Sequence, residues 1–210
     1  AATAFESWGQ TTPSQRQQAL LKIADAIEAR ADELVHLEAE NTGKPFALTT
    51  SEEIPPMVDQ IRFFAGAARV LEGRASAEYM PGHTSWVRRE PIGVVGQVTP
   101  WNYPMMMAVW KFAPALAAGN TVVLKPAPDT PWCAAAVGAI IAADTDIPPG
   151  VVNIVTSADH QLGAQLASDP RVDLISFTGS TATGKAVMTA AASNLKKVFL
   201  ELGGKSAAIV

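Results

Sequence analysis

Hydrophobic positions in the first third of the chain recur every three or four residues, which is the spacing of one face of an α-helix. Residues 12–15 (Thr-Pro-Ser-Gln) supply a capping threonine, a proline at the first helical position and a capping-box glutamine. Gly43 and Pro45 end this segment, and a second helix is expected from Pro55 to Gly73. Residues 1–75 are therefore predicted to be helical. The recurring apolar positions of the first segment are Leu20, Ile23, Ala24, Ile27, Leu34 and Leu37.

Residues 77–91 form a stretch bounded by glycine and proline, with the run Pro-Gly-His-Thr-Ser-Trp-Val-Arg-Arg at 81–89. This pattern predicts the two strands of a hairpin. From Ile92 onward, short β-rich runs alternate with helical segments. The predicted strands are 94–98, 121–125, 151–155, 174–178, 198–201 and 207–210, and the predicted helices are 105–118, 131–143, 161–167 and 184–192.

Strands that are apolar on both faces and separated by one helix each are typical of βαβ units. We therefore predict an α/β fold, with a doubly wound parallel sheet over residues 92–210. Right-handed crossovers bring the carboxyl ends of all strands to one edge of such a sheet, where ligands bind. The candidate chemistry of this chain stands at those strand ends.

The composition narrows the class of protein. The chain has 210 residues, 48% hydrophobic and 17% charged, so it can bury a core and is not intrinsically disordered. Its single cysteine excludes a disulfide framework and indicates a reducing, cytoplasmic compartment. The net charge of −4 argues against nucleic-acid or acidic-membrane partners, and no apolar run approaches the ~20 residues of a membrane span. The 3 histidines have no metal-ligand spacing, so no metal is expected.

The first predicted strand is followed by Thr-Pro-Trp-Asn-Tyr-Pro at 99–104. Pro100 and Pro104 bracket Asn102 and hold it in a non-helical turn. A rigid side-chain amide at the ligand edge could donate to a developing oxyanion. The alternative is that Asn102 caps the next helix and that Trp101 is a core aromatic residue.

Two further strand ends carry candidate binding groups. Lys125 ends the second strand, where its ammonium could bind a ribose hydroxyl or a phosphate; the alternative is a lysine that points to solvent. Thr178 to Lys185 form a glycine-bounded turn before a helix, an arrangement that binds pyrophosphate on backbone N–H groups. This turn has neither the Gly-x-Gly-x-x-Gly nor the Walker spacing, so an ordinary strand–helix connection is its alternative.

Glu201 continues the strand that begins at Val198, and Gly203 and Gly204 after it allow a ligand or another backbone to approach closely. A carboxylate at the end of an apolar strand is expected to be partly desolvated, which suits a general base. The alternative is an ion pair with Lys205 or another cation.

Cys133 is the only thiol. Behind Thr130 and Pro131 it falls in the first turn of a predicted helix, where the helix dipole could activate it. Its apolar surroundings and the lack of a neighbouring histidine in the sequence favour a buried structural cysteine instead.

Four motifs in this order strongly resemble the aldehyde dehydrogenase superfamily: 99–104, Lys-Pro-Ala at 125–127, Phe-Thr-Gly-Ser-Thr at 177–181 and Glu-Leu-Gly-Gly-Lys-Ser at 201–206. Each motif is weak alone, but the ordered set is highly specific. The segments 90–94, 114–120 and 149–153 extend the likeness over nearly the whole chain. Within the superfamily, the chain is most similar to the γ-aminobutyraldehyde or betaine-aldehyde type.

The resemblance implies the Rossmann-like cofactor domain of an enzyme that oxidises an aldehyde to a carboxylic acid with NAD(P)+, through a cysteine thiohemiacetal and a thioester. Asn102 would be the oxyanion-hole amide, and Glu201 the base that activates the deacylating water. Lys125 would contact the adenosine ribose, and Gly179 and Ser180 would face the pyrophosphate. The other cofactor-binding residues that it implies are Val98, Thr99, Pro100, Trp101, Ala127, Gly163, Thr178 and Leu202.

Two departures from the family pattern concern the choice of cofactor. The family often has a glutamate that selects the unphosphorylated ribose where this chain has Pro128, which leaves NADP+ open. Asp159 replaces a common glycine near the expected adenosine end and favours NAD+. NAD+ is the cofactor that we expect.

The nucleophilic cysteine of the family lies downstream of the motif at 201–206. The chain is therefore expected to be the N-terminal cofactor-binding portion of a longer enzyme, cut at both ends and lacking the catalytic domain, and residues 1–5 show no signal peptide. Family members form homodimers or homotetramers through hairpin strands, here around 77–91. A non-catalytic dinucleotide-binding or oligomer-scaffold module is the alternative. A reductase of acyl-phosphates fits less well, because Glu201 suits a hydrolytic second step.

Overall fold

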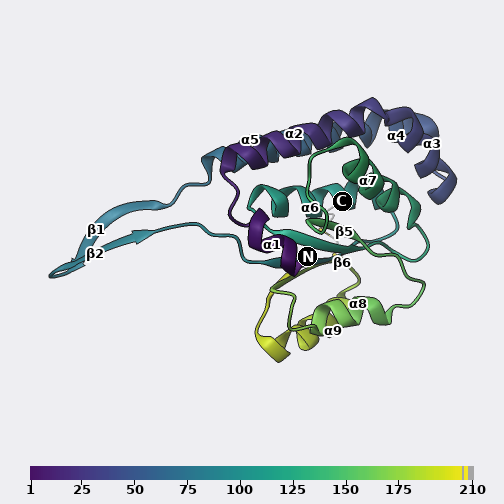
Figure 1. Cartoon of the computed structure of the whole chain (residues 1–210). Coiled ribbons are helices and arrows are strands. Elements are labelled where there is room, and N and C mark those ends of the chain that lie inside the picture. The colour runs from purple at the N-terminus through teal and green to yellow at the C-terminus, as the bar shows by residue number, and fades with distance from the viewer. Residues whose placement is uncertain (205, 208–210) are drawn as a thin grey trace.

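The computed structural model describes residues 1–204, 206 and 207, and its centre is a parallel sheet of 5 strands in the order β5-β4-β3-β6-β7 (Figure 1). The predicted doubly wound parallel sheet is confirmed. The strand predicted at 207–210 lies outside the described residues, apart from Ala207. The strands are β3 (Val94–Val98), β4 (Thr121–Lys125), β5 (Val152–Ile154), β6 (Leu174–Gly179) and β7 (Lys197–Leu202).

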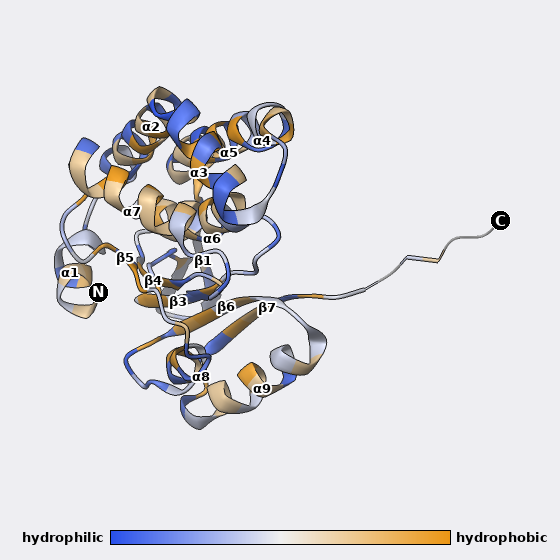
Figure 2. Cartoon of the chain, turned by 90° about the vertical axis from the view of Figure 1, so that its right-hand side faces the viewer, coloured by the Kyte–Doolittle hydropathy of each residue, from blue (hydrophilic) through white to orange (hydrophobic). Residues whose placement is uncertain are grey.

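Helices cover both faces of the sheet (Figure 2). α6 (Pro104–Ala117) and α7 (Trp132–Asp144) lie on one face, whereas α8 (Gln161–Ser168) and α9 (Thr181–Ala191) lie on the other. The chain after β3 therefore turns to one face, and the chain after β6, its neighbour in the sheet, turns to the opposite face. Loops that diverge in this way leave a crevice outside the carboxyl ends of the strands.

The N-terminal helices form an outer layer over α6 and α7 (Figures 1 and 2). Their apolar face is buried against α6, and Leu20 and Ile23 are fully inaccessible to solvent, as is Phe112 of α6. The predicted capping box is present, because Thr12 Oγ1 accepts a hydrogen bond from Gln15 N at 3.3 Å and Gln15 Oε1 accepts one from Thr12 N at 2.8 Å. The elements of this layer are α2 (Pro13–Ala29), α3 (Ala31–Thr42), α4 (Phe46–Glu52), α5 (Ile54–Ala67) and the 3₁₀ turn η1 (Ala68–Val70), whereas α1 (Ala2–Trp8) lies beside the sheet near β5.

Two features of this layer differ from the sequence pattern. The helical segment expected at 12–43 is interrupted at Arg30, whose ψ of 23° is not helical. The helical prediction over residues 1–75 includes α1 and α4 but does not delimit them, because 7 residues are too few to show a repeating apolar spacing. Among the described residues, no helix combines the length and the apolar character needed to cross a bilayer.

An antiparallel hairpin projects from the sheet (Figure 1) and consists of β1 (Arg74–Met80) and β2 (His83–Val87). Gly82 in its turn has φ +74°, which glycine adopts without steric cost. Tyr79 and Trp86 are both exposed on it. Because a two-stranded hairpin is at most marginally stable alone, contact with another surface would stabilise this one.

Candidate active site

The strand register brings the predicted site residues to one edge of the sheet. Val98, at the end of β3, is paired with Lys125 of β4 on one side and with Phe177 of β6 on the other. Glu201 of β7 is paired with Thr178, one residue beyond Phe177. The chemistry predicted at four separate strand ends thus lies along a single line of the fold.

A cleft of about 210 Å³ lies between α8 and α9 over this edge. Three of the predicted cofactor residues, Val98, Lys125 and Gly163, line it together with His160 and Phe177. Sequence reasoning had not selected His160 or Phe177. Phe177 could have been found from the pattern, because it is the last apolar residue of a strand that ends in the glycine-bounded turn.

Lys125 is buried in this cleft, with 3% of its surface exposed, so the interpretation of a lysine that points to solvent is wrong. Its Nζ donates a hydrogen bond to the carbonyl of Pro126 at 3.1 Å. Burial lowers the pKa of Lys125, and the negative charge of Asp159 opposes part of that shift. An ammonium has three donors, so a hydroxyl-rich ligand in the cleft would find further hydrogen bonds there.

The predicted pyrophosphate turn is shorter than expected, because α9 begins at Thr181 and not at 184. Ser180 is the N-cap of α9, and its side-chain hydroxyl accepts a hydrogen bond from Thr183 N at 3.2 Å. A Cβ atom at Gly179 would lie 2.6 Å from the Phe177 ring, so only glycine fits here without displacing that ring. Because α9 follows the carboxyl end of β6, its N-terminus lies at the carboxyl edge of the sheet. This is the positive end of the helix dipole, which favours the binding of an anion.

The turn that carries Asn102 is open to solvent. Trp101 is 63% exposed and is not a core residue. The N-cap of α6 is Tyr103 and has no side-chain capping bond, so Asn102 does not cap the helix either. Both alternative interpretations of this motif are wrong. Asn102 and Trp101 line a hollow of about 290 Å³ with Lys44 and Asp129, separate from the α8–α9 cleft.

Four other predicted cofactor residues, Thr99, Pro100, Ala127 and Leu202, do not line the α8–α9 cleft. Thr99 and Ala127 are buried, and Pro100 and Leu202 are half-buried. Thr99 is held by a backbone hydrogen bond from its N to the carbonyl of Lys125 at 3.2 Å. Leu202 is the last residue of β7 and packs against the apolar cluster beneath α9.

Glu201 is exposed, so the expected partial desolvation is wrong for the described residues. The reason is that β7 is the last strand of the sheet among the described residues, its exposed and half-buried residues alternate, and Glu201 lies on the exposed face with Phe199. The half-buried residues of β7 face the opposite side and pack against an apolar cluster that includes Val187 and Ala191 of α9. They are Val198, Leu200 and Leu202.

Glu201 and Thr178 line a third hollow, of about 480 Å³, whose floor holds Lys111 of α6. Lys111 Nζ donates a hydrogen bond to Ser176 Oγ at 2.9 Å. Burial lowers the pKa of Lys111 to about 8, and the negative charge of Glu201 opposes part of the shift. Sequence reasoning missed Lys111, although it is the only charged residue in an otherwise apolar helix.

Cys133 is fully buried in α7, which begins at Trp132 with Pro131 as its N-cap. Burial, together with the nearby charge of Glu38, raises the pKa of this thiol, so the dipole does not activate it. The expectation of a buried structural cysteine is confirmed.

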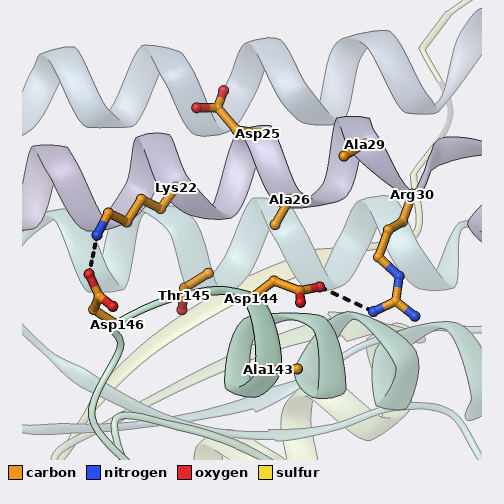
Figure 3. Close-up of a pocket in the computed structure, with 9 residues that line it drawn as sticks. All are labelled: Lys22, Asp25, Ala26, Ala29, Arg30, Ala143, Asp144, Thr145 and Asp146. Carbon is orange, nitrogen blue, oxygen red and sulfur yellow. Dashed lines mark hydrogen bonds and ion pairs between the residues drawn. The ribbon is translucent and has the colours of Figure 1, made fainter.

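A larger hollow of about 690 Å³ lies between α2 and the end of α7 (Figure 3). Its walls are charged: Lys22 is ion-paired with Asp146, and Arg30 with Asp144 at 3.2 Å. Because α7 runs antiparallel to the strands, its end lies at the amino edge of the sheet, opposite the candidate site. Exposed ion pairs of this kind contribute little to stability and do not indicate a catalytic centre.

The sequence model of the aldehyde dehydrogenase family matches residues 1–210. An aldehyde dehydrogenase of Paracoccus denitrificans is 46% identical over 206 residues, which are 98% of this chain and 40% of that protein. The crystal structure of PnpE in complex with nicotinamide adenine dinucleotide has a TM-score of 0.94 and 42% identity over 99% of this chain and 42% of its own. Betaine aldehyde dehydrogenase of Staphylococcus aureus in complex with NAD+ has a TM-score of 0.92 and 37% identity over 97% of this chain and 40% of its own.

The chain spans about 40% of the length of the relatives that it matches. The fold, the ordered motifs at the carboxyl edge of the sheet and the family match along all 210 residues agree with one another. The chain belongs to the aldehyde dehydrogenase family.

Proposed function

We propose that this chain is the cofactor-binding portion of a longer enzyme that oxidises an aldehyde to a carboxylic acid with NAD+. The observation that carries the proposal is a single sheet edge: Lys125, the Gly179–Ser180 turn and Glu201 lie at the ends of paired strands there, and the loop that carries Asn102 leaves β3 at the same edge. The share of about 40% that the chain covers in its relatives supports the idea of a longer protein.

The residues of the α8–α9 cleft fit a dinucleotide. The buried Lys125 ammonium has donors for the adenosine ribose, and Gly179 leaves the space beside Phe177 that a side chain would fill. The N-terminus of α9 and the Ser180 turn would hold the pyrophosphate on backbone N–H groups. When bound, NAD+ would accept the hydride of the aldehyde carbon. His160 and Phe177 would enclose the adenosine end.

The reaction would then use two groups of this chain. A thiolate from outside these 210 residues would add to the aldehyde carbon, and the Asn102 amide would donate a hydrogen bond to the oxyanion of the tetrahedral adduct. Loss of hydride from that adduct leaves a thioester. Glu201 would accept a proton from a water molecule, whose oxygen attacks the thioester carbon and releases the carboxylic acid and the thiol. The exposed position of Glu201 leaves it accessible to that water.

The test is Glu201→Gln in the full-length protein. The amide keeps the shape of the side chain but cannot accept the proton, so deacylation should slow by about a hundredfold or more. A first burst of NADH should persist while steady-state turnover falls, and mass spectrometry should detect the acyl-enzyme. Steady-state turnover equal to that of the parent would overturn the assigned role. Asp59→Asn, at an exposed acidic residue of α5, is the matched control.

The second candidate is a dinucleotide-binding or scaffold role for these 210 residues alone, and the burial of Cys133 favours it. A thiol with no access to solvent and a raised pKa cannot attack a substrate. The 210-residue chain by itself should therefore bind NAD+ without oxidising aldehydes. Thiol-dependent aldehyde oxidation by this chain, lost in Cys133→Ser, would overturn that expectation. The amino-aldehyde substrate class stays a prediction.

We also propose a homodimer or homotetramer assembled through the β1–β2 hairpin. The exposed Tyr79 and Trp86 of that hairpin support this assignment, because aromatic side chains are enriched at interfaces.

A further inference from the structure

Lys44 lies at the turn between α3 and α4, and the backbone there directs its side chain inward. Gly43 ends α3 with φ +77°, and its N–H donates a hydrogen bond to the Ala39 carbonyl. Lys44 N in turn donates to Thr42 Oγ1 at 3.2 Å. The Lys44 side chain is only 14% exposed, which is unusual for the most solvated of the charged residue types.

Two carboxyl groups, both fully buried, hold the Lys44 ammonium. Its Nζ lies 3.0 Å from Glu38 Oε1 and 2.5 Å from Glu53 Oε1. Within the described residues, the second oxygen of each glutamate, Oε2, has no hydrogen-bond partner. Burial and the proximity of Glu38 raise the pKa of Glu53, and the hydrogen bond and charge of Lys44 oppose part of that shift. The two buried carboxyl groups therefore share one ammonium.

The same ammonium lies over the ring of Tyr103, with 4.2 Å between Nζ and the ring centroid. This distance is within the range of a cation–π interaction, which is strongest where water is excluded. Tyr103 directly follows Asn102 and is the N-cap of α6. Lys44 and Asn102 also line the same hollow of about 290 Å³.

Two further hydrogen bonds tie α3 and α7 to this region. Trp132 N donates to Asn41 Oδ1 at 3.0 Å, and Thr130 Oγ1 donates to the carbonyl of Trp101 at 3.5 Å. The turn at residues 101–103 is therefore contacted both by the loop before α7, at Trp101, and by Lys44, at Tyr103. A buried ion cluster is a poor means of stabilising a fold, since apolar residues of the same volume often do so better. The contact with Tyr103 offers another reason for its presence.

We propose that Lys44, held by the Glu38 and Glu53 carboxyls, is a positioning residue that holds the Tyr103 ring and so orients the Asn102 amide toward the reacting carbonyl oxygen. The inference rests on the proposed function of Asn102. A displacement of about 1 Å at a catalytic group can slow a reaction by about a hundredfold, so a distant clamp of this kind is sufficient to affect the rate.

The test uses the full-length protein and the rate of the first NADH burst, which reports the steps up to the thioester. We expect Lys44→Met to slow the burst by about tenfold or more, with the Kd for NAD+ unchanged. Lys44→Arg keeps the charge and can stack on the ring, so its burst rate should stay within about threefold of the parent. Lys22→Met, at an exposed ion pair of α2, is the matched control and should match the parent.

A double-mutant comparison separates positioning from a purely structural role. Asn102→Ala should itself slow the burst by about a hundredfold. If Lys44 acts through Asn102, adding Lys44→Met to Asn102→Ala should cost less than about twofold more. If Lys44→Met slows the burst by the same factor in the parent and in Asn102→Ala, the inference is overturned. It is also overturned if Lys44→Met has the burst rate of the parent while Asn102→Ala is slow. A parent-like burst in Asn102→Ala would instead overturn the proposed function of Asn102, and the inference with it.

Removing the ammonium alone leaves buried carboxyls unpaired and could prevent folding. The triple variant Lys44→Met with Glu38→Gln and Glu53→Gln removes every charge of the cluster while keeping its volume. If Lys44→Met does not fold, this variant takes its place, and the same slow burst is expected. A folded triple variant with the burst rate of the parent would overturn the inference.

Discussion

The side-chain ammonium of Lys111 donates a hydrogen bond to the hydroxyl of Ser176 at 2.9 Å, on the floor of the hollow that Glu201 lines. Burial lowers the pKa of Lys111 to about 8, whereas a lysine in an unfolded chain has a pKa of about 10.4. Between these values the unfolded chain binds more protons than the folded one, so this residue makes stability rise with pH across that window.

Lys111→Met keeps the buried stem and removes the charge, and should remove this pH dependence. We expect the difference in melting temperature, variant minus parent, to be more positive at pH 7 than at pH 10. Differential scanning fluorimetry of the full-length protein at the two pH values measures this. Lys185→Met, at an exposed lysine of α9, is the control: its melting temperature should differ from that of the parent by the same amount at pH 7 and at pH 10. A pH-independent offset for Lys111→Met would contradict the lowered pKa.

Lys125 is predicted to contribute to cofactor binding from its buried position in the α8–α9 cleft. A hydrogen bond to a charged group contributes about 1.5–3 kcal/mol, so Lys125→Met should raise the Kd for NAD+ by about tenfold or more. Calorimetric titration with NAD+ measures the change. Lys197→Met is the matched control, because Lys197 is an exposed strand lysine at the amino edge of the same sheet. Equal Kd values for the two variants would argue against the assignment of this cleft to the cofactor.

Asp159 is predicted to disfavour NADP+. Its Oδ1 accepts a hydrogen bond from Gln161 N at 2.8 Å at the start of α8, and its charge acts on Lys125 in the cleft. A 2′-phosphate near this carboxylate would be repelled, by about 1 kcal/mol at short range in water. Asp159→Asn should therefore lower the ratio of the Kd for NADP+ to the Kd for NAD+ by about fivefold, as measured by titration with both.

A second acidic residue, Asp129, provides the control for that experiment. Asp129 is exposed and follows Pro128, the position where the resembled family often has its selective glutamate. Asp129→Asn should leave the ratio unchanged. If only Asp129→Asn changes the ratio of the two Kd values, the loop after β4, and not Asp159, selects between the cofactors.

Trp86 is predicted to lie in the interface between protomers. It is 63% exposed on β2, and a buried interface tryptophan typically contributes 2 kcal/mol or more, about thirtyfold in Kd. Trp86→Ser should shift the full-length protein toward smaller species in sedimentation velocity. Phe63 of α5 is also 63% exposed and lies off the hairpin, so Phe63→Ser should leave the assembly intact. The reverse pattern would place the interface on α5.

The regular elements could largely be predicted from the sequence. The strands at 94–98 and 121–125 have the bounds that their apolar runs indicated, because each is buried on both faces and its pattern is uninterrupted. The sheet edge was predictable too, since βαβ connections fix where strand ends meet. The bounds of the short α1 and α4 were not predictable, because helices of this length depend on packing for their stability.

The candidate site was predictable in its residue types but not in its environments. Lys125 turned out buried and Glu201 exposed, the opposite of the simplest interpretations, because the burial of a strand-end side chain depends on which helix or strand covers it. Lys44 and Tyr103 are distant in the sequence, and no local pattern relates them.

The sequence by itself therefore determined the order of strands and helices, the parallel sheet and the chemical groups at its carboxyl edge, since these follow from periodicity and chain connectivity. Only the tertiary structure decided which of those groups are desolvated, which ammonium pairs with which carboxyl, and that Lys44 contacts Tyr103 beside Asn102. Protonation and orientation depend on the dielectric and the charges contributed by other elements, and these arise only when the chain packs.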